Sequence, residues 1–391
     1  MKPQSVNFSK HAWLSLISIL FGGGVTLTLL NIFFVPDETN FEAASTLGAE
    51  TTDNFGIVDG FLIHCFGSRD ADRCLDGQRQ RAPNEAALWL GNSQVHAVNQ
   101  LQPGETNAAP LLFKSLQKKG IDLLTFSLPN ANLQEHYVLF EYLRVRMPLK
   151  LLILPVCFDD LREDGLRNPD VTDFLGDSET AHSLSETLIG RRLLNSAASA
   201  DKNTDLGGAK DDTEGIAGTI QERVEKRLND WLGVHSRLWR LRPEIRGWLF
   251  YSVLYPFRNT VLGITPSTTR KVIPGRYRDN LAALEATLVR AKSTGVRVIV
   301  YVVPLRGGVK IPYDAAEYMA FKAELEHLVQ QHGATFENLE NLVPDESWGT
   351  KSSTSFKASE EIDFMHFAFP GHRLLADALD RTATTAMLNK N

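Results

Sequence analysis

The stretch AALWLGNSQ, residues 86–94, begins as a short apolar run and then breaks at four small or polar residues. A continuous apolar run of this length that ends in a turn is typical of a strand buried on both faces. Three further runs have the same character, IDLLTFSLP (121–129), LKLLILPV (149–156) and VRVIVYVVP (296–304). Together these runs predict a buried sheet.

Segments with helical spacing of their apolar residues separate these runs. They are APLLFKSLQKKG (109–120), NLQEHYVLFEYLRVRMP (132–148) and YRDNLAALEATLVRAKSTG (277–295). Gly120, Pro148 and Gly295 mark their ends, as helix-stopping residues should. Buried strands that alternate with helices indicate a parallel sheet covered on both faces. We therefore expect an α/β fold, a three-layer sandwich with a central parallel sheet.

The N-terminal segment HAWLSLISILFGGGVTLTLLNIFFV, residues 11–35, carries no charged side chain after its histidine. About 20 apolar residues suffice for a helix to cross a hydrocarbon core, so this segment predicts a single membrane span. Lysines lie before the segment and acidic residues follow it. The positive-inside rule then places the tail at 1–10 in the cytoplasm and the remainder of the chain outside.

A cleaved signal peptide and a buried core helix are the alternatives to a membrane anchor. The apolar stretch exceeds the usual core of a signal peptide, and no small-residue cleavage site follows it directly. Its three consecutive glycines and its apolar surface on all sides suit lipid better than an amphipathic soluble helix. We expect an inner-membrane anchor at 11–35, a linker at 36–54 and a periplasmic domain at 55–391.

The alternation of strands and helices breaks between about 161 and 274, which indicates an insertion. Residues 195–215 are rich in Ser, Ala, Asp and Gly, so they predict a mobile loop. Residues 216–263 have helical spacing and many aromatic and arginine side chains. They fit either a subdomain that packs on the sheet, or a lid or amphipathic surface that docks on a membrane or a membrane partner.

The composition narrows the classes of function. The chain has 391 residues, 43% of them hydrophobic, which is ample for one large core. A formal net charge of -6 gives no electrostatic argument for a nucleic-acid partner. The sequence has no HExxH, paired CxxC, Walker or dinucleotide-binding motif. We therefore expect no metal and no cofactor.

The chain contains three cysteines. Cys65 and Cys74 lie in HCFGSRDADRC, which has the composition of a polar loop. In an oxidising compartment they can close a disulfide, although two unrelated thiols fit the sequence as well. Cys157 follows an apolar run, which predicts a buried thiol rather than a reactive one.

The C-terminal segment EIDFMHFAFPGHRLLADAL holds a candidate acid–base pair, Asp363 and His366, directly before the expected last helix. A carboxylate that accepts a hydrogen bond from one imidazole nitrogen leaves the other nitrogen to take a proton from a serine. An acid and a histidine at this spacing also occur by chance, as a surface residue and a helix cap. The pair becomes a catalytic candidate only if a serine lies nearby.

Ser93 can be that serine if 86–90 is the first strand, because it then lies at the carboxyl end of the strand. Open α/β sheets place their sites at this edge, where the next helix can present N–H groups to a developing oxyanion. The chain order Ser, Asp, His fits several hydrolase folds. The GxSxG elbow of the α/β-hydrolases is not matched, because residue 95 is Val95.

GNSQ after the first strand and DFMH before the last helix together resemble the SGNH (GDSL-like) esterase and acyltransferase superfamily. The resemblance extends in order over roughly residues 84–385, apart from the insertion. It implies a flavodoxin-like α/β fold. It also implies that Ser93 is the nucleophile, that His366 is the general base and then the acid, and that Asp363 orients His366.

The middle motifs of the family match less well. Its second motif supplies a glycine N–H, whereas this chain reads FSLPNANLQEHY, so the resemblance points to Asn130 or Asn132 as donor. Its third motif, Gly-x-Asn-Asp, is replaced in PVCFDDL, which places Asp159 where the asparagine belongs. An ionised aspartate cannot donate to an oxyanion and would repel one.

Arg306 follows the last predicted strand of the sheet in VVPLRGG. At that position it can bind an anionic sugar or a carboxylate, although an ordinary solvated arginine fits the sequence as well.

Weak middle motifs are also a feature of the membrane-anchored branch of the superfamily, which includes alginate O-acetylation proteins and the D-alanyl transfer protein of teichoic acids. The resemblance therefore implies O-acetyl transfer to, or deacetylation of, a surface or exported polysaccharide through an acyl-enzyme at Ser93. A multi-span membrane-bound O-acyltransferase is then the expected partner. The alternatives are a general carboxylesterase or lipase-like hydrolase, and a catalytically silent scaffold in a polysaccharide assembly complex.

Overall fold

The computed structural model of the chain describes residues 56–95, 101–102, 104–128, 130–204, 254–263, 268–352 and 360–388, together with Gly22, Val25 and Thr28. Apart from these three positions, the predicted membrane span at 11–35 lies outside the described residues. Within the described residues, no helix combines the length and the hydrophobicity that a membrane span requires.

The chain divides into two compact units. One unit comprises Met1–Ala44 and Gly208–Leu262, and its main described element is helix α12 (Tyr255–Leu262), which exposes apolar side chains. The rest of the predicted helical segment at 216–263 lies almost entirely outside the described residues. The other unit comprises Ser45–Gly207 and Gly263–Asn391 and contains the sheet and all the candidate site residues.

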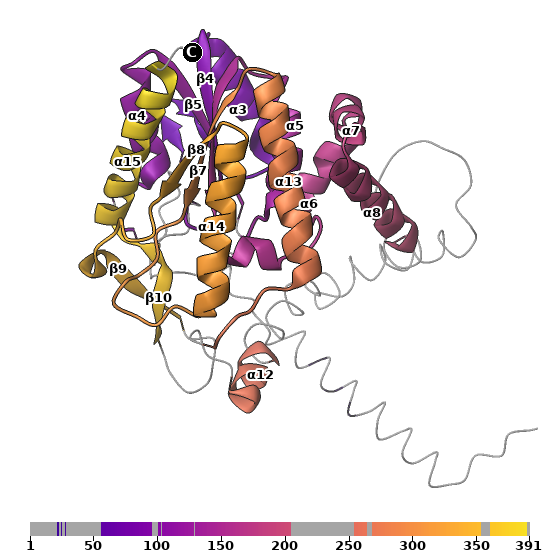
Figure 1. The fold of residues 1–391 in the computed structure, drawn as a ribbon, viewed down its shortest axis with the longest axis vertical. Helices are drawn as coiled ribbons and strands as arrows, with labels where there is room; N and C mark the ends of the chain where they lie inside the picture. The colour runs from indigo at the N-terminus through magenta and orange to yellow at the C-terminus, as the bar shows by residue number, and fades with distance from the viewer. Residues whose placement is uncertain are drawn as a thin grey trace, which may run out of the picture. The chain divides into compact units, whose positions relative to one another are not determined.

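A six-stranded parallel sheet in the order β3-β5-β4-β6-β7-β8 forms the centre of this second unit (Figure 1). The strands are β3 (His64–Cys65), β4 (Glu85–Gly91), β5 (Ile121–Ser127), β6 (Leu149–Val156), β7 (Arg297–Val302) and β8 (Thr335–Asn338). Counted from β4, the strands β4 to β8 have the order 2-1-3-4-5, which is the flavodoxin-like order.

Helices cover both faces of the sheet. They are α4 (Ala108–Gln117), α5 (Leu133–Arg144), α13 (Pro274–Ser293), α14 (Ala315–Gln331) and α15 (Phe369–Leu388). Helix α4 packs against α15 on one face, and α5 packs against α13 on the other (Figure 1). Helix α14 is tied to α13 by the hydroxyl of Tyr277, which donates to Glu324 Oε2 at 2.7 Å. The predicted three-layer α/β sandwich is confirmed.

Local sequence explains why these elements form where they do. In β4 every residue after Glu85 is buried, because helices cover both faces, and this burial accounts for the uninterrupted apolar run. Helix α5 begins at a capping box, in which the Asn132 side chain accepts from the Glu135 backbone N–H and the Glu135 side chain accepts from the Asn132 backbone N–H.

The region before β4 differs from what the sequence predicts. The stretch 86–90 is not the first strand, because the short strands β1 (Ile57–Val58), β2 (Phe61–Leu62) and β3 precede it. The stretch HCFGSRDADRC is not a polar loop either, since most of it belongs to helix α3 (Ser68–Arg81). Charged neighbours hide the buried stripe of this helix in the sequence. The buried side chains recur at helical spacing and are Ala71, Cys74, Leu75 and Gln78.

Cys65 and Cys74 are joined by a disulfide, with their Cα atoms 6.6 Å apart. The bond links the edge strand β3 to helix α3. The free thiol of Cys157 is buried, as its position after an apolar run predicts.

The described part of the predicted insertion at 161–274 is largely helical. It contains the end of the 3₁₀ helix η1 (Asp159–Arg162), then α6 (Pro169–Thr172), η2 (Asp173–Gly176), α7 (Ser178–Ser185) and α8 (Leu188–Thr204). Because α8 continues to Thr204, the first part of the predicted mobile loop at 195–215 is helical. Alanine, the strongest helix former, is frequent there and favours this conformation.

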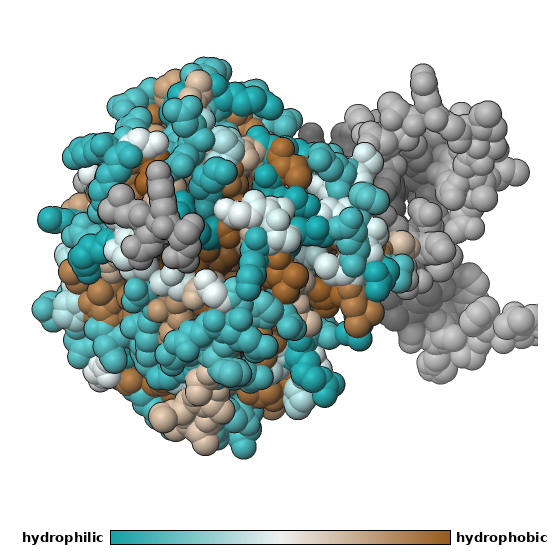
Figure 2. All heavy atoms as spheres, turned by 45° about the horizontal axis from the view of Figure 1, so that its top comes forward, coloured by the Kyte–Doolittle hydropathy of each residue, from teal (hydrophilic) through white to brown (hydrophobic). Residues whose placement is uncertain are grey.

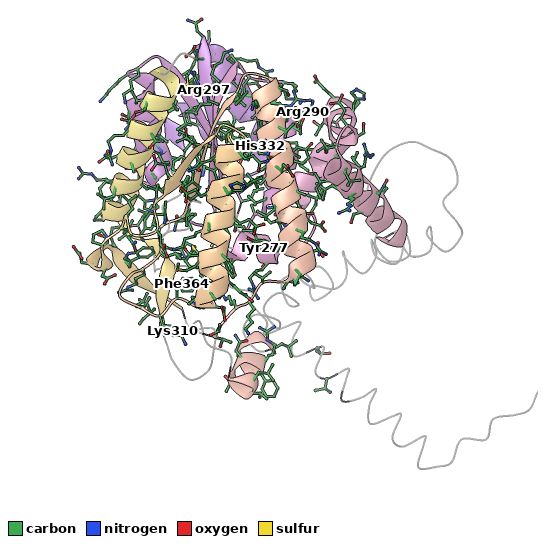
Figure 3. All side chains as sticks on the ribbon, in the orientation of Figure 1. Tyr277, Arg290, Arg297, Lys310, His332 and Phe364 are labelled. Carbon is green, nitrogen blue, oxygen red and sulfur yellow. A yellow bond between two sulfur atoms is a disulfide. The ribbon has the colours of Figure 1, made fainter. Side chains whose placement is uncertain are left out.

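A buried network of charges attaches the α7 segment to the sandwich. The carboxylate of Glu141 on α5 is fully buried and is paired with Arg144 at 2.7 Å and with Arg290 at 3.2 Å. Arg290 lies near the end of α13 that faces α7 (Figure 3) and also pairs with Glu186 at 2.5 Å. The apolar side chains of this unit form a buried core cluster, and the face drawn in Figure 2 is mostly hydrophilic with scattered apolar areas.

Candidate active site

The candidate site lies at the carboxyl edge of the parallel strands, where β4 ends. Strand β10 (Glu360–Phe367) pairs antiparallel with β9 (Trp348–Ser352) outside the main sheet and supplies the acid–base pair. In Figure 1 this edge is the lower one, where β10 lies and where α13, α14 and α15 begin. Loops at this edge are the usual location of ligand sites in open α/β sheets.

Ser93, His366 and Asp363 form a continuous chain of hydrogen bonds. Ser93 Oγ lies 3.0 Å from His366 Nε2, and His366 Nδ1 lies 3.0 and 3.2 Å from the two carboxylate oxygens of Asp363. Ser93 is half-buried, whereas Asp363 is 1% exposed. The structure therefore brings together three side chains although Ser93 and His366 are 273 residues apart in the sequence.

The backbone fixes the carboxylate of Asp363 in this position. Its Oδ1 accepts from the N–H groups of Met365 at 2.9 Å and His366 at 3.1 Å. Because the carboxylate is only an acceptor, His366 Nδ1 carries the proton and Nε2 faces Ser93 with its lone pair. This tautomer is the one that can take a proton from a serine hydroxyl.

The turn that carries Ser93 is anchored at each neighbouring residue. The Gly91 carbonyl accepts from the Leu128 N–H at 3.1 Å, and Val95 N–H donates to the Asn92 carbonyl at 3.2 Å. A Cβ at Gly91 would lie 3.0 Å from the Val95 Cβ and 3.1 Å from the Ser127 Cβ, so a side chain there would force these neighbours to shift.

Gln94 joins the turn at residues 91–95 that carries the candidate nucleophile Ser93, here called the nucleophile turn, to the segment of β10 that carries Asp363 and His366. Its side chain is fully buried, and Nε2 donates to the carbonyl oxygens of Met365 at 2.7 Å and Pro304 at 2.9 Å. Met365 lies between Asp363 and His366, so this amide links the turn that carries Ser93 directly to the segment that carries His366.

Asn92 and Asp160 also hold the nucleophile turn through hydrogen bonds. Asn92 Nδ2 donates to Asp160 Oδ2 at 3.3 Å, and Asn92 Oδ1 accepts from the Gln94 N–H at 3.1 Å. Asp160 Oδ2 also accepts from the Cys157 N–H at 2.8 Å. Burial raises the pKa of Asp160 to about 8, and the Cys157 hydrogen bond opposes this shift, so the carboxyl is largely protonated at neutral pH.

Two histidines near the site are kept neutral by burial. Burial lowers the pKa of His136 to about 4, although its hydrogen bond to the Gly91 carbonyl opposes the shift. Burial, and then the nearby His366, lower the pKa of His372 to about 3. The ring of His372 lies 4.6 Å from the ring of Phe367, inside the core.

Of the two asparagines expected to serve an oxyanion, Asn132 has its side chain in contact with the backbone of the chain itself. Its Oδ1 caps α5, and its Nδ2 donates to the Gly165 carbonyl at 2.8 Å. Asn130 is exposed and has a φ of 56°, in the left-handed region where glycine is most at ease and asparagine is tolerated. Asn130 thus has a backbone conformation that glycine adopts readily.

Asp159 is surrounded by side chains that donate hydrogen bonds to its carboxylate. Its carboxylate accepts from Arg270, from Tyr313 Oη at 3.1 Å and from Arg162 at 3.3 Å. The guanidinium of Arg270 also lies over the ring of Phe364, which Figure 3 marks on β10. The adjacent Asp160, not Asp159, reaches the nucleophile turn.

Arg306 binds the backbone of the β9–β10 arm. Its Nη1 donates to the carbonyl oxygens of Gly349 at 3.1 Å and Asp363 at 3.5 Å, and its N–H donates to the Phe364 carbonyl at 3.1 Å. These contacts hold the turn that carries Asp363 and His366. The expected contact of Arg306 with a substrate anion stays a prediction.

Sequence reasoning missed the roles of Asn92, Gln94 and Asp160. Asn92 and Gln94 flank Ser93, and amides at such positions are typical of ordinary turns. Asp160, the second aspartate of PVCFDDL, is the one position whose signal was available, because Gly-x-Asn-Asp, the motif with which this stretch is compared above, also ends in aspartate.

The site geometry can be set beside known proteins. No family model matches the chain, and no curated protein matches it. Among solved structures it is similar to two variants of Axe2, an acetyl-xylooligosaccharide esterase from Geobacillus Stearmophilus, each with TM-score 0.36, 11% identity, and coverage of 76% of this chain and 94% of the esterase chain. A protein described as an acylhydrolase, from Bacteroides fragilis NCTC 9343, matches with TM-score 0.33, 10% identity, and coverage of 79% and 94%. Likenesses of this size assign no activity to the chain.

Proposed function

We propose that this chain is a serine-dependent acyl-ester hydrolase or acyltransferase in which Ser93 is the nucleophile. The observation that carries the proposal is the hydrogen-bonded chain from Ser93 Oγ through His366 to Asp363. The nucleophile, the base and the group that orients the base each have the role-specific geometry that acyl transfer requires.

In the first half of the reaction His366 Nε2 takes the hydroxyl proton as Ser93 Oγ bonds to the ester carbonyl carbon. The tetrahedral intermediate then collapses, the bond to the alcohol oxygen breaks, and His366 returns the proton to the departing alcohol. The acyl group is left on Ser93 as an ester. The Asp363 carboxylate stabilises the imidazolium that forms in between.

In the second half a water molecule or a sugar hydroxyl gives its proton to His366 and attacks the acyl carbon. The intermediate collapses, Ser93 Oγ leaves and recovers the proton from His366. The product is a carboxylic acid if water attacks and a new ester if a sugar attacks. For the oxyanion we propose backbone N–H groups of the Ser93 turn and of Asn130, whose left-handed conformation suits this glycine position.

The test is Ser93-dependent chemistry of the full chain. We expect a fluorophosphonate probe to label the protein, and a chromogenic acetyl ester to be turned over, only when Ser93 is present. Ser93→Ala should abolish labelling and lower kcat by at least about 10³-fold. The matched control is Ser185→Ala on helix α7, which should react as wild type. Equal labelling and turnover in wild type and Ser93→Ala would rule the proposal out.

We further propose that the physiological acyl group is acetyl and that the acceptor or substrate is a surface or exported polysaccharide. The motif resemblance supports this choice. A mass-spectrometric assay with an acetyl ester as donor and an oligosaccharide as acceptor distinguishes transfer from hydrolysis. Ser93-dependent acetylation of the sugar supports transfer, and release of acetate alone supports the hydrolase.

We also propose that the site-bearing unit is periplasmic, anchored at the inner membrane through 11–35, with a multi-span membrane-bound O-acyltransferase as partner. The apolar N-terminal segment and the Cys65–Cys74 disulfide, which suits an oxidising compartment, support this placement. Protease digestion of membrane vesicles of known orientation tests it. Digestion of the unit from the cytoplasmic side would contradict it.

A further inference from the structure

A second serine–histidine pair contacts the nucleophile turn and is completely buried, with an asparagine in place of the aspartate. His64 Nε2 lies 2.6 Å from Ser127 Oγ, and His64 Nδ1 lies 3.3 Å from Asn107 Nδ2. All three side chains have 0% exposure, so no substrate reaches them. The mechanism above uses none of them, and their burial calls for a structural or positioning explanation.

The orientation of Asn107 fixes the protonation of this group. Asn107 Oδ1 accepts from the Ala109 N–H at 3.1 Å as the N-cap of α4, so its other side-chain atom is the amide nitrogen, a donor. His64 Nδ1 must then accept, which places the proton on Nε2 and makes His64 the donor to Ser127 Oγ. Asn107, His64 and Ser127 thus form a chain of hydrogen bonds, here called the relay, in which each donor and acceptor is fixed and His64 has one favourable tautomer.

Both ends of the relay reach the turn that carries Ser93. Asn107 Nδ2 also donates to the Val95 carbonyl at 3.2 Å. Ser127 is the register partner of Gly91 in the β4–β5 ladder, and its Cβ would lie only 3.1 Å from a Cβ on Gly91. The relay therefore holds the first and the last residue of the Gly91–Val95 turn.

His64 itself is held by the edge strand. Its neighbour Cys65 pairs with Phe126 in the sheet and is bonded to Cys74 of α3. The disulfide thus fixes the short strand that presents the imidazole between Ser127 and Asn107.

We propose that His64 is a positioning residue, which through Ser127 and Asn107 holds the Gly91–Val95 turn so that Ser93 Oγ meets His366. The catalytic part of this inference rests on the proposed function. A displacement of a reacting group by about 1 Å can cost roughly 10²-fold in rate, so a relaxed turn should lower kcat more than it raises KM.

The experiment compares Asn107→Ser, Ser127→Ala and the double variant in the full chain. Serine caps a helix about as well as asparagine and is neutral, so Asn107→Ser removes the amide donor while keeping the cap of α4. The control is Asp314→Ser, which makes the corresponding exchange at the N-cap of α14. Two readouts are used, steady-state kinetics with a chromogenic acetyl ester and amide hydrogen exchange of peptides that contain residues 91–95.

We expect each single variant to lower kcat by about 10- to 100-fold with KM within about twofold, and to speed exchange in the 91–95 peptides. Because both variants break the same relay, the double variant should be no worse than the poorer single variant by more than about threefold. Asp314→Ser should change neither readout.

Two results would overturn the inference. One is a double variant whose loss of kcat equals the product of the two single losses, and the other is amide hydrogen exchange at 91–95 that stays at the wild-type rate. If wild type shows no Ser93-dependent turnover, the proposed function fails, and hydrogen exchange still decides whether the relay holds the turn.

Discussion

At the residue scale, adjacent side chains of one type acquire different roles. Asp159 and Asp160 are neighbours, yet Asp159 is partly exposed and paired with Arg270, whereas Asp160 is buried against Asn92. Burial raises the pKa of Asp160 to about 8, so its carboxyl supports the nucleophile turn through Asn92 without carrying a full negative charge at neutral pH. Asp159, whose charge is the objection that the sequence raises against an oxyanion site, has its carboxylate in contact with Arg162, Arg270 and Tyr313, and the two arginines balance that charge.

The orienting role of Asp363 gives a prediction for Asp363→Asn. The introduced amide oxygen can still accept from the N–H groups of Met365 and His366, so the turn should keep its shape. Its NH₂ group would face His366 Nδ1 and force the proton onto Nε2, which then cannot accept from Ser93. We expect kcat to fall by roughly 10⁴-fold with little change in thermal stability. A variant that keeps more than about a tenth of the activity would contradict this role for Asp363.

At the scale of elements, the site depends on contacts among segments that are separate in the chain. The turn after β4 is bound by the turn in β10 through Gln94, by η1 through Asn92 and Asp160, and by the start of α4 through Asn107. The edge strand β3 is short, and its attachment to α3 is covalent. The position of this short edge strand thus depends on the disulfide as well as on its few hydrogen bonds to the sheet.

The disulfide gives a prediction at this scale. Closing a loop of nine residues' separation should stabilise the folded chain by about 2–3 kcal/mol, chiefly by restricting the unfolded state. We expect Cys65→Ser with Cys74→Ser to lower the free energy of unfolding in urea by this amount. Reductant should destabilise wild type to the same extent and leave the double variant unchanged. A wild-type midpoint that is insensitive to reductant would contradict the prediction.

At the scale of the whole unit, burial of ionisable groups couples folding to pH. The neutral histidines His136 and His372 lie in the interior with pKa values lowered to about 4 and about 3. In the unfolded chain each titrates near 6.5, so between about pH 6.5 and 4 the unfolded state binds more protons. The stability that these groups contribute is present above about pH 6.5 and is lost as the pH falls.

His372→Leu tests this coupling. The substitution removes the titrating group and keeps an apolar side chain of similar size against Phe367. Between about pH 6.5 and 4, wild type should lose up to about 1.4 kcal/mol per pH unit relative to the variant. Urea unfolding at several pH values measures the difference. Parallel pH dependences of the two proteins would show that His372 is not neutral in the folded state.

The pattern of single segments predicts much of this fold. The runs at 121–129, 149–156 and 296–304 form β5, β6 and β7, and the segment 132–148 forms α5, because burial on both faces or on one stripe leaves a period in the local sequence. The motifs around Ser93 and His366 also point to their pairing. The helix that contains Cys74 was missed, since charged residues hide its narrow buried stripe.

The sequence by itself determined β4 to β7, the helices α4, α5, α13 and α15, and the candidate residues Ser93, His366 and Asp363, because these depend on residues close together in the chain or on short motifs. Only the tertiary structure decided which amides and carboxyls support Ser93. Gln94 meets Met365 across 271 residues and His64 meets Ser127 across 63. Such contacts arise from the packing of whole elements, and that packing leaves no period or motif at either partner.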